Sequence, residues 1–280
     1  MTAAPDDKVL HFGVFEVMAA QVGGTFSWTH PRSEGIDYMN VDFWIRTAKI
    51  LEETGFDFLF FAGGYGYPIV DGDLSEVAVS RGINFSGLDA DYLIPVLAQH
   101  TEKLGFVVTQ STGLDHPVQL ARRFTTLDHL TGGRVGWNIV TGASQNAVAE
   151  VFGHDEMMSH DVRYEMAGEY VELAARFWET AWDDDAYVAD RESGLFARRD
   201  GIHRVVYDGK HYSSRGYSAR RPRRSAPRCS SRPERRPPDA PSRRRTPSAC
   251  SCRPPPRRAP PRPSPTSGPG PWKADAHRSL

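Results

Sequence analysis

The chain has 280 residues, and 34 Lys and Arg almost balance 35 Asp and Glu, giving a net charge of -1. This length allows a sizeable core in one α/β domain or two smaller ones. The first 216 residues contain no cysteine, no signal-peptide pattern and no long apolar span, which argues against a disulfide-rich or membrane-spanning protein and predicts a cytoplasmic one.

The net charge near zero is the sum over two segments of opposite charge and different composition. Residues 1–216 carry a net charge of -15, whereas residues 217–280 carry +14 and hold 16 of the 21 prolines and all three cysteines. Apart from Leu280, the second segment has no Leu, Ile, Val or Phe. It cannot bury enough apolar surface to offset the entropy of ordering, so we expect a disordered tail. Its cysteines have no His partner or regular metal-ligand spacing, and we predict no metal site: Cys229, Cys250 and Cys252.

The first half of the segment 1–216 is predicted to consist of alternating strands and helices. Asn40 or Asp42 can cap the first helix, and Gly55 ends it. The Gly-Gly-Tyr-Gly-Tyr-Pro loop after the second strand lacks the third glycine and the helix of a dinucleotide fingerprint, so we expect no Rossmann site. The predicted elements are strand 10–17, loop 18–39, a helix to about 53, strand 56–62, loop 63–88, helix 91–103 and strand 105–112.

The stretch from His116 to Thr141 is the most informative. It predicts a helix with apolar residues at spacings of 4, 3 and 3, which ends at Gly132-Gly133. A strand that is apolar on both faces then follows from Arg134. Asn138 interrupts that strand, and a buried amide costs a few kcal/mol unless it is hydrogen-bonded. Asn138 therefore either bonds neighbouring backbone or faces a ligand.

After a predicted loop, 142–158, a long helix is expected from Ser159 or Asp161 to about Trp182. Strands and helices thus alternate four times, which predicts a parallel sheet in either an open doubly wound fold or a (β/α)₈ barrel. In both folds the ligand lies at the carboxyl ends of the strands. The polar or flexible residues expected there are Gly63, Thr109, Gln110, Asn138 and Thr141.

Two long motifs carry a family resemblance. They are HP-x-x-x-ARRF-x-TLDHL-x-GGR-x-x-WN-x-V, beginning at His116, and HD-x-RY-x-x-A-x-E-Y from His160 to Tyr170. Their order and content resemble the bacterial-luciferase-type flavin monooxygenases. Within these, the chain is similar to the group of nitrilotriacetate, dibenzothiophene-sulfone, dimethyl-sulfide and long-chain-alkane monooxygenases. The resemblance covers about residues 10–216.

The resemblance implies a (β/α)₈ barrel, here its N-terminal half, that uses reduced FMN and O₂ to oxygenate a small organic substrate. It also implies a separate NAD(P)H-dependent flavin reductase as partner, and it is compatible with a homo-oligomer. By the resemblance, Thr109 and Asn138 contact the flavin ring and Tyr164 reaches the FMN phosphate. Gly63 stands where relatives commonly have a flavin-contacting aspartate. No catalytic residue is assigned.

Simpler explanations exist for most of these side chains. Thr109 can be a structural strand residue, and Tyr164 a half-buried aromatic with its hydroxyl in water. Three histidines suit loop, helix-face and capping roles better than catalysis, and three arginines suit ion pairs better than an anion site: His116, His129 and His160; Arg122, Arg123 and Arg134.

Two other functions compete with the monooxygenase. The basic tail can bind nucleic acid through phosphates, although Tyr217 and Trp272 are its only aromatic residues for stacking on bases. A cofactor-free barrel hydrolase would need a nucleophile, a histidine and an acid in suitable spacing, and the chain offers no such set.

The family pattern breaks near Gly216, and we predict that residues 217–280 are a frameshift product. If the true frame begins one nucleotide earlier, the codons for Arg228 to Arg235 permit Pro-Leu-Leu-Leu-Gln-Ala-Gly-Ala. This resembles the fifth strand and phosphate-binding loop of the family. With about four of eight strands left, the barrel does not close, and we expect the chain to bind FMN weakly or not at all.

The frameshift is tested by reading the DNA from the codon for Ser213 through the stop codon in all three frames. We expect the frame one nucleotide earlier to stay open and to encode a Gln-Ala-Gly loop followed by further βα units. A stop codon soon after position 217 in that frame would contradict the frameshift and make the basic tail genuine.

Overall fold

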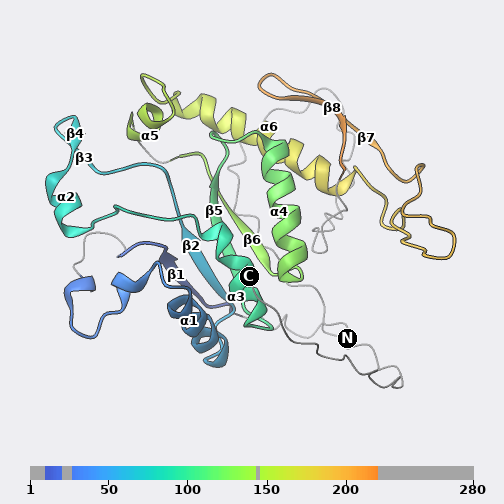
Figure 1. Cartoon of the computed structure of the whole chain (residues 1–280). Coiled ribbons are helices and arrows are strands. Elements are labelled where there is room, and N and C mark those ends of the chain that lie inside the picture. The colour runs from blue at the N-terminus through green and yellow to red at the C-terminus, as the bar shows by residue number, and fades with distance from the viewer. Residues whose placement is uncertain (1–9, 21–26, 143–145, 220–280) are drawn as a thin grey trace, which may run out of the picture.

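The computed structural model describes residues 10–20, 27–142 and 146–219. Within them, four parallel strands form a sheet whose spatial order is the order of the chain, as expected for successive βα units (Figure 1). The predicted strands are all confirmed with slightly shorter bounds. They are β1 (Gly13–Val17), β2 (Phe58–Ala62), β5 (Gly105–Ser111) and β6 (Val135–Val140).

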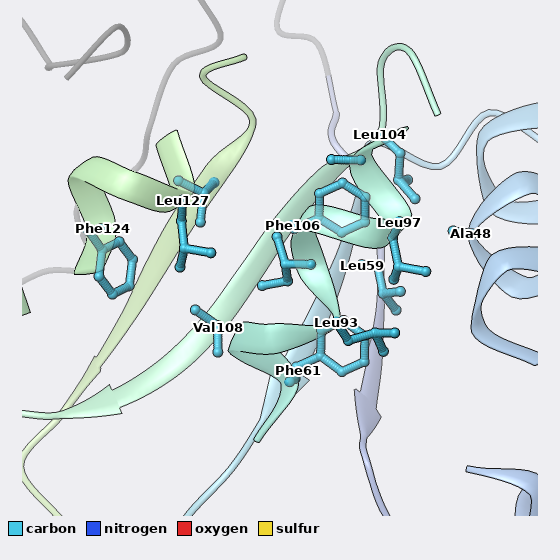
Figure 2. Close-up of a cluster of buried hydrophobic side chains, with 14 of the residues drawn as sticks. Ala48, Leu59, Phe61, Leu93, Leu97, Leu104, Phe106, Val108, Phe124 and Leu127 are labelled. Atoms are coloured by element: carbon cyan, nitrogen blue, oxygen red, sulfur yellow. The ribbon is translucent and has the colours of Figure 1, made fainter. Parts of the chain in front are cut away.

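Three helices cover one face of the sheet, namely α1 (Val41–Glu53), α3 (Ile94–Gln99) and α4 (Pro117–Thr131). Alternate strand residues point into this layer, because successive side chains of a strand lie on opposite faces. Figure 2 shows the resulting core, in which leucines from the helices pack on strand aromatics. Its side chains include Ala48, Leu59, Phe61, Leu93, Leu97, Leu104, Phe106, Val108, Phe124 and Leu127.

The predicted helix after His116 forms as α4, with a signal at each end. The His116 ring accepts a hydrogen bond from the Val118 backbone, and the side chain of Gln119 accepts one from the His116 backbone. Together these bonds satisfy N–H groups that a helix start leaves unpaired. Gly132 closes the helix with φ 66°, a left-handed conformation that glycine adopts without steric cost. His116 is thus a helix cap.

The expected long helix is α6 (His160–Glu179), and it ends three residues earlier than predicted. Ser159 is its N-cap residue but makes no side-chain capping bond. A hairpin of β7 (Arg204–Asp208) and β8 (Ser213–Tyr217) packs on α6 around a second apolar cluster (Figure 1). Glu169 fixes the hairpin turn, because its carboxylate accepts the backbone N–H groups of Lys210, His211 and Tyr212.

Two segments that we predicted as loops contain secondary structure, so these two predictions were wrong. The segment 63–88 contains a two-residue hairpin, β3 (Ile69–Val70) with β4 (Asp73–Leu74), and the helix α2 (Glu76–Arg81). The segment 142–158 contains α5 (Asn146–Val151). Both helices have six residues, too few for apolar periodicity to stand out in the sequence. The helix predicted over 91–103 is a 3₁₀ turn, Ala90–Tyr92, followed by the shorter α3.

The predicted tail, 217–280, lies almost wholly outside the described residues. Its first residue, Tyr217, belongs to β8 and pairs with Arg204, and Trp182 donates a hydrogen bond to the Ser218 carbonyl. The three tail cysteines also lie outside the described residues.

The amino end of the sheet is held by two charged side chains that bond to backbone. Glu52 accepts the N–H groups of residues 102–104, at 2.5–3.1 Å. Arg134 donates to the carbonyls of Ala98 and Leu104 and of Thr131, so it ties the end of α3 to the start of β6. These bonds satisfy groups that helix ends and turns would otherwise leave unpaired.

Glu52→Gln should therefore reduce the free energy of unfolding by about 2 kcal/mol at pH 7, the usual scale for hydrogen bonds to a charged group. Burial works to raise the pKa of Glu52, but the backbone N–H groups and Arg134 outweigh it and lower the pKa. Because the folded-state pKa is below the unfolded one, the stabilisation is present near neutral pH and is lost as pH falls through the lowered pKa.

Urea unfolding at several pH values measures this effect. The neighbouring exposed residue provides the control, and Glu53→Gln should leave the midpoint unchanged. Equal midpoints for the wild type and Glu52→Gln at pH 7 would rule out the proposed role of the carboxylate.

Candidate functional site

A cavity of about 1220 Å³ opens at the carboxyl ends of the four strands. Its walls come from the segments that follow β2, β5 and β6, together with residues 84–91 and the stretch from α5 into α6. Parallel sheets bind ligands at this end. The volume slightly exceeds the usual range for small-molecule pockets, so it can hold a cofactor and a substrate together.

Thr109 and Asn138 form a polar pair in the wall of this cavity. They are neighbours in the register of β5 and β6, and Asn138 Nδ2 donates to Thr109 Oγ1 at 3.0 Å. The Thr109 hydroxyl in turn donates to the Phe61 carbonyl at 3.2 Å. With its proton committed, Thr109 Oγ1 retains acceptor capacity only. Asn138 thus bonds a neighbouring side chain and also lines the cavity.

The glycine-rich loop after β2 reaches α5 across the cavity. Tyr65 packs edge-to-face on Phe152, with ring centroids 5.3 Å apart, and the Tyr67 hydroxyl donates to Glu150 Oε2 at 2.8 Å. Gly63 lines the cavity, and a Cβ added there would meet nothing within 4 Å. At this place the chain offers a ligand open space and no side-chain group.

Tyr164 is placed differently from Arg163, its neighbour on α6. Tyr164 is 44% exposed, stacks on the His160 ring with centroids 4.4 Å apart, and is not among the residues that line the cavity. Arg163 does line it and donates to the carbonyls of Thr141 and Gly142. The structure brings Gly63, Thr109 and Asn138 to the cavity, whereas Tyr164 lies on the surface of α6.

A second polar group in the wall centres on the Gln110 side chain. Its Nε2 donates to Asp91 Oδ2 at 2.8 Å, and its Oε1 accepts from Arg123 Nη1 at 3.0 Å. Arg123 Nη2 also donates to Asp115 at 2.6 Å, which confirms the ion-pair role expected of this arginine. Burial raises the pKa of Asp91, against the hydrogen bond from Gln110 and the nearby charge of Arg123.

Several residues of the cavity were not predicted from the sequence. Asp91 lies in a 3₁₀ turn whose residues show no periodicity, and the other missed residues follow the unpredicted helix α5 or begin α6. A possible signal was the pair of adjacent methionines between two polar stretches, since flexible thioethers often line adaptable pockets. These missed residues are Phe152, His154, Met157, Met158 and Arg163.

Comparison with known proteins gives a consistent result. The model of the luciferase-like monooxygenase family matches residues 21–238. Dimethyl-sulfide monooxygenase from Hyphomicrobium sulfonivorans is 34% identical over 82% of this chain and 46% of its own length. Nitrilotriacetate monooxygenase component A from Aminobacter aminovorans is 30% identical over 75% of this chain and 46% of its own.

The structural comparison agrees. A crystal structure of a riboflavin lyase with modified FMN and riboflavin has a TM-score of 0.74 and 36% identity, over 78% of this chain and 48% of that one. The chain therefore spans about half the length of the relatives it matches.

The polar pair gives a stability prediction. Thr109→Val keeps the side-chain shape but leaves the Asn138 amide and the Phe61 carbonyl without their partner, so the free energy of unfolding should fall by about 1–2 kcal/mol. Thr109→Ser restores the hydroxyl and should recover most of the loss. Urea unfolding of the three proteins measures this, and a Thr109→Val midpoint at or above that of the wild type would contradict the pairing.

Proposed function

Because the chain belongs to the luciferase-like monooxygenase family, we propose that it forms the flavin-facing wall of an enzyme that uses reduced FMN and O₂ to oxygenate a small organic substrate. Its fold is the α/β type of this family, and the four described parallel strands correspond to the N-terminal half of a (β/α)₈ barrel. The substrate classes we consider are organosulfur compounds, aminopolycarboxylates and alkanes, as in the related enzymes.

The observation that carries this proposal is the Thr109–Asn138 pair in the cavity wall. Thr109 Oγ1 can still accept a hydrogen bond, and a reduced flavin ring presents N–H groups at its edge. Both side chains sit on the sheet face opposite the helices, together with Phe60 and Val107 by strand alternation. A flat ring with one polar edge fits a surface of this composition.

When bound, reduced FMN supplies the reaction with O₂, and the protein positions it and limits access of water. Thr109 and Asn138 would orient the ring through its polar edge. Phe15 and Phe60, whose rings meet edge-to-face with centroids 5.1 Å apart, would pack against apolar parts of the ligands. Tyr65 and Phe152 would restrict entry of water from the side of α5.

We assign the phosphate of FMN to the start of α6. Tyr164 lies in the first turns of this 20-residue helix, where unpaired N–H groups and the helix dipole favour an anion. Its exposed hydroxyl is available to such a ligand if the ligand extends beyond the cavity along α6. Gly63 would face the flavin without contributing a carboxylate.

The proposed source of reduced FMN is a separate NAD(P)H-dependent flavin reductase. The name "component A" of the nitrilotriacetate relative supports a multi-component system. No described helix is long and apolar enough to cross a membrane. The nucleic-acid alternative rests on the basic tail, which lies outside the described residues apart from its first three, and none of the relatives reported above is named for nucleic-acid binding.

The flavin-binding test compares this chain with a frame-restored protein. That protein is encoded by the same gene after its reading frame is shifted at codon 217 to the alternative frame. The frame-restored protein should quench FMN fluorescence saturably, whereas this chain should bind FMN weakly or not at all. Asn138→Ala in the frame-restored protein should weaken binding about tenfold, or about 1.4 kcal/mol. Asn40→Ser, which retains a good helix cap on α1, is the control and should leave binding unchanged.

Failure of the frame-restored protein to bind FMN would overturn the proposed function. Stoichiometric FMN binding by the present chain would instead show that the second half of the barrel is not needed for the flavin site.

A further inference from the structure

The face of the sheet opposite α1, α3 and α4 is apolar and accessible. We call it the inner face, and by strand alternation its larger apolar side chains are Phe15, Val17, Phe58, Phe60, Val107 and Val140. Phe15 is 52% exposed and the other five are partly exposed, whereas Leu59 and Phe61 on the helix side are buried. None of the described strand residues on the inner face is charged. An accessible apolar surface of this kind is typical of a face that a protein partner covers.

Small and large residues alternate across the inner face at the amino end of the sheet. Gly13, Phe58 and Gly105 are register neighbours on β1, β2 and β5. A Cβ added at Gly13 would collide with the Phe58 ring, and one added at Gly105 would lie 3.4 Å from Phe58 Cβ. The two glycines therefore make room for the Phe58 side chain. Such alternation is common where strands enclose a narrow barrel interior, so the inner face has the composition of a closed barrel.

The two edge strands of the sheet can each accept another strand (Figure 1). Within the described part of the chain, β1 is paired only with β2, and β6 only with β5. The sequence of β6 contains neither a charged residue nor a proline, which are the usual protection of an edge against pairing. The charged residue of β1 is Glu16, and alternation places it on the helix side.

We propose that two copies of this chain pair through these edges and close one eight-stranded barrel. The four strands run in the same direction and follow one another in chain order, so β1 and β6 lie at opposite edges. A two-fold axis along the barrel then places β6 of each copy beside β1 of the other, which creates two identical parallel seams. Four strands from each copy give about eight, the number at which side chains just fill a barrel interior.

A second copy suits this surface better than the other candidate partners. The basic tail lies almost wholly outside the described residues, and its sequence has no Leu, Ile, Val or Phe apart from Leu280, so it cannot supply apolar strands. Its positive charge also meets no carboxylate among the strand residues of the inner face. Two copies do not repel each other through net charge, since each carries only -1. An unrelated partner would have to match both edges at once.

In this dimer each copy completes the cavity of the other. The inner face of the second copy lies opposite, so the cavity at the carboxyl ends of the strands gains a second wall and a second Thr109–Asn138 pair. In a single chain the cavity lacks this wall. Neither copy contains the Gln-Ala-Gly loop expected of the family, so the expected weak binding of FMN is unchanged. Pairing of the two chains does not depend on the flavin chemistry proposed above.

Analytical ultracentrifugation of the full chain between about 1 and 100 µM tests the assembly. We expect a reversible species of twice the 31.2 kDa chain mass and nothing larger, because the closed ring leaves no free edge. Phe15→Glu places a charge inside the closed barrel and should raise the dissociation constant at least about tenfold. Phe196→Glu is the matched control and should leave the constant unchanged. Phe196 is 63% exposed and packs edge-to-face on Tyr187, as Phe15 does on Phe60.

Amide hydrogen exchange of the wild type locates the interface and needs no variant, in case Phe15→Glu fails to fold. In the dimer, peptides that cover β1 and β6 should exchange as slowly as those that cover β2 and β5. Dilution that dissociates the dimer should speed exchange in β1 and β6 more than in β2 and β5, because only the edge strands lose hydrogen bonds.

A chain that stays monomeric at the highest concentration would overturn the proposal, and so would assembly that continues beyond two copies. A dimer that Phe15→Glu and Phe196→Glu affect equally, or one in which β1 and β6 exchange rapidly, would also overturn it. All of these measurements are made without FMN, so the assembly and the proposed function can fail separately.

Discussion

Alternation along the four parallel strands sends neighbouring side chains into two different environments, and most of the structure follows from that division. Leu59, Phe61, Phe106 and Val108 point to the helices and build the core. The intervening residues face the other side, where the same periodicity places Phe60, Thr109 and Asn138. A one-residue slip in the register of β5 or β6 would exchange the two sets. The core and the proposed flavin wall are therefore specified by the same hydrogen-bonding register.

The two ends of the sheet use charge in opposite ways. At the amino end, Glu52 and Arg134 bond to backbone N–H and carbonyl groups, so each charge satisfies groups that the fold itself leaves unpaired. At the carboxyl end, Asp91 retains an oxygen without a partner in the described residues, beside two further carboxylates. Unsatisfied buried polar groups are uncommon in folded proteins. Among the described residues they occur in the cavity wall, at Asp91 and Arg163, and also away from it, at His129 and Tyr170.

The sequence was sufficient for the elements with strong local signals. Leu120, Phe124 and Leu127 predicted α4, and Gly132 predicted where it ends. Strand polarity placed Gly63, Thr109 and Asn138 at one edge, where the structure also has them.

The six-residue helices α2 and α5 were not predicted, since their folding depends on tertiary packing more than on periodicity. Asp91 was not predicted for a similar reason: the residues it contacts, Gln110 and Arg123, are distant from it in sequence. The position of Tyr164 also required three-dimensional information, because only the rotation of α6 decides that Arg163 faces the cavity.

The hairpin β7–β8 packs with Leu173 of α6 and with residues that follow this helix in an apolar cluster distinct from the main core, and both clusters pack against the partly buried Phe177 and Tyr212. Glu169 of α6 holds the hairpin turn through the three backbone N–H groups of Lys210, His211 and Tyr212. Segments with their own core can open as cooperative units while the remainder stays folded. The hairpin is thus arranged as one such unit, in which slow amide exchange would be lost together, whereas Tyr170 and Ala174 hold α6 in the main core.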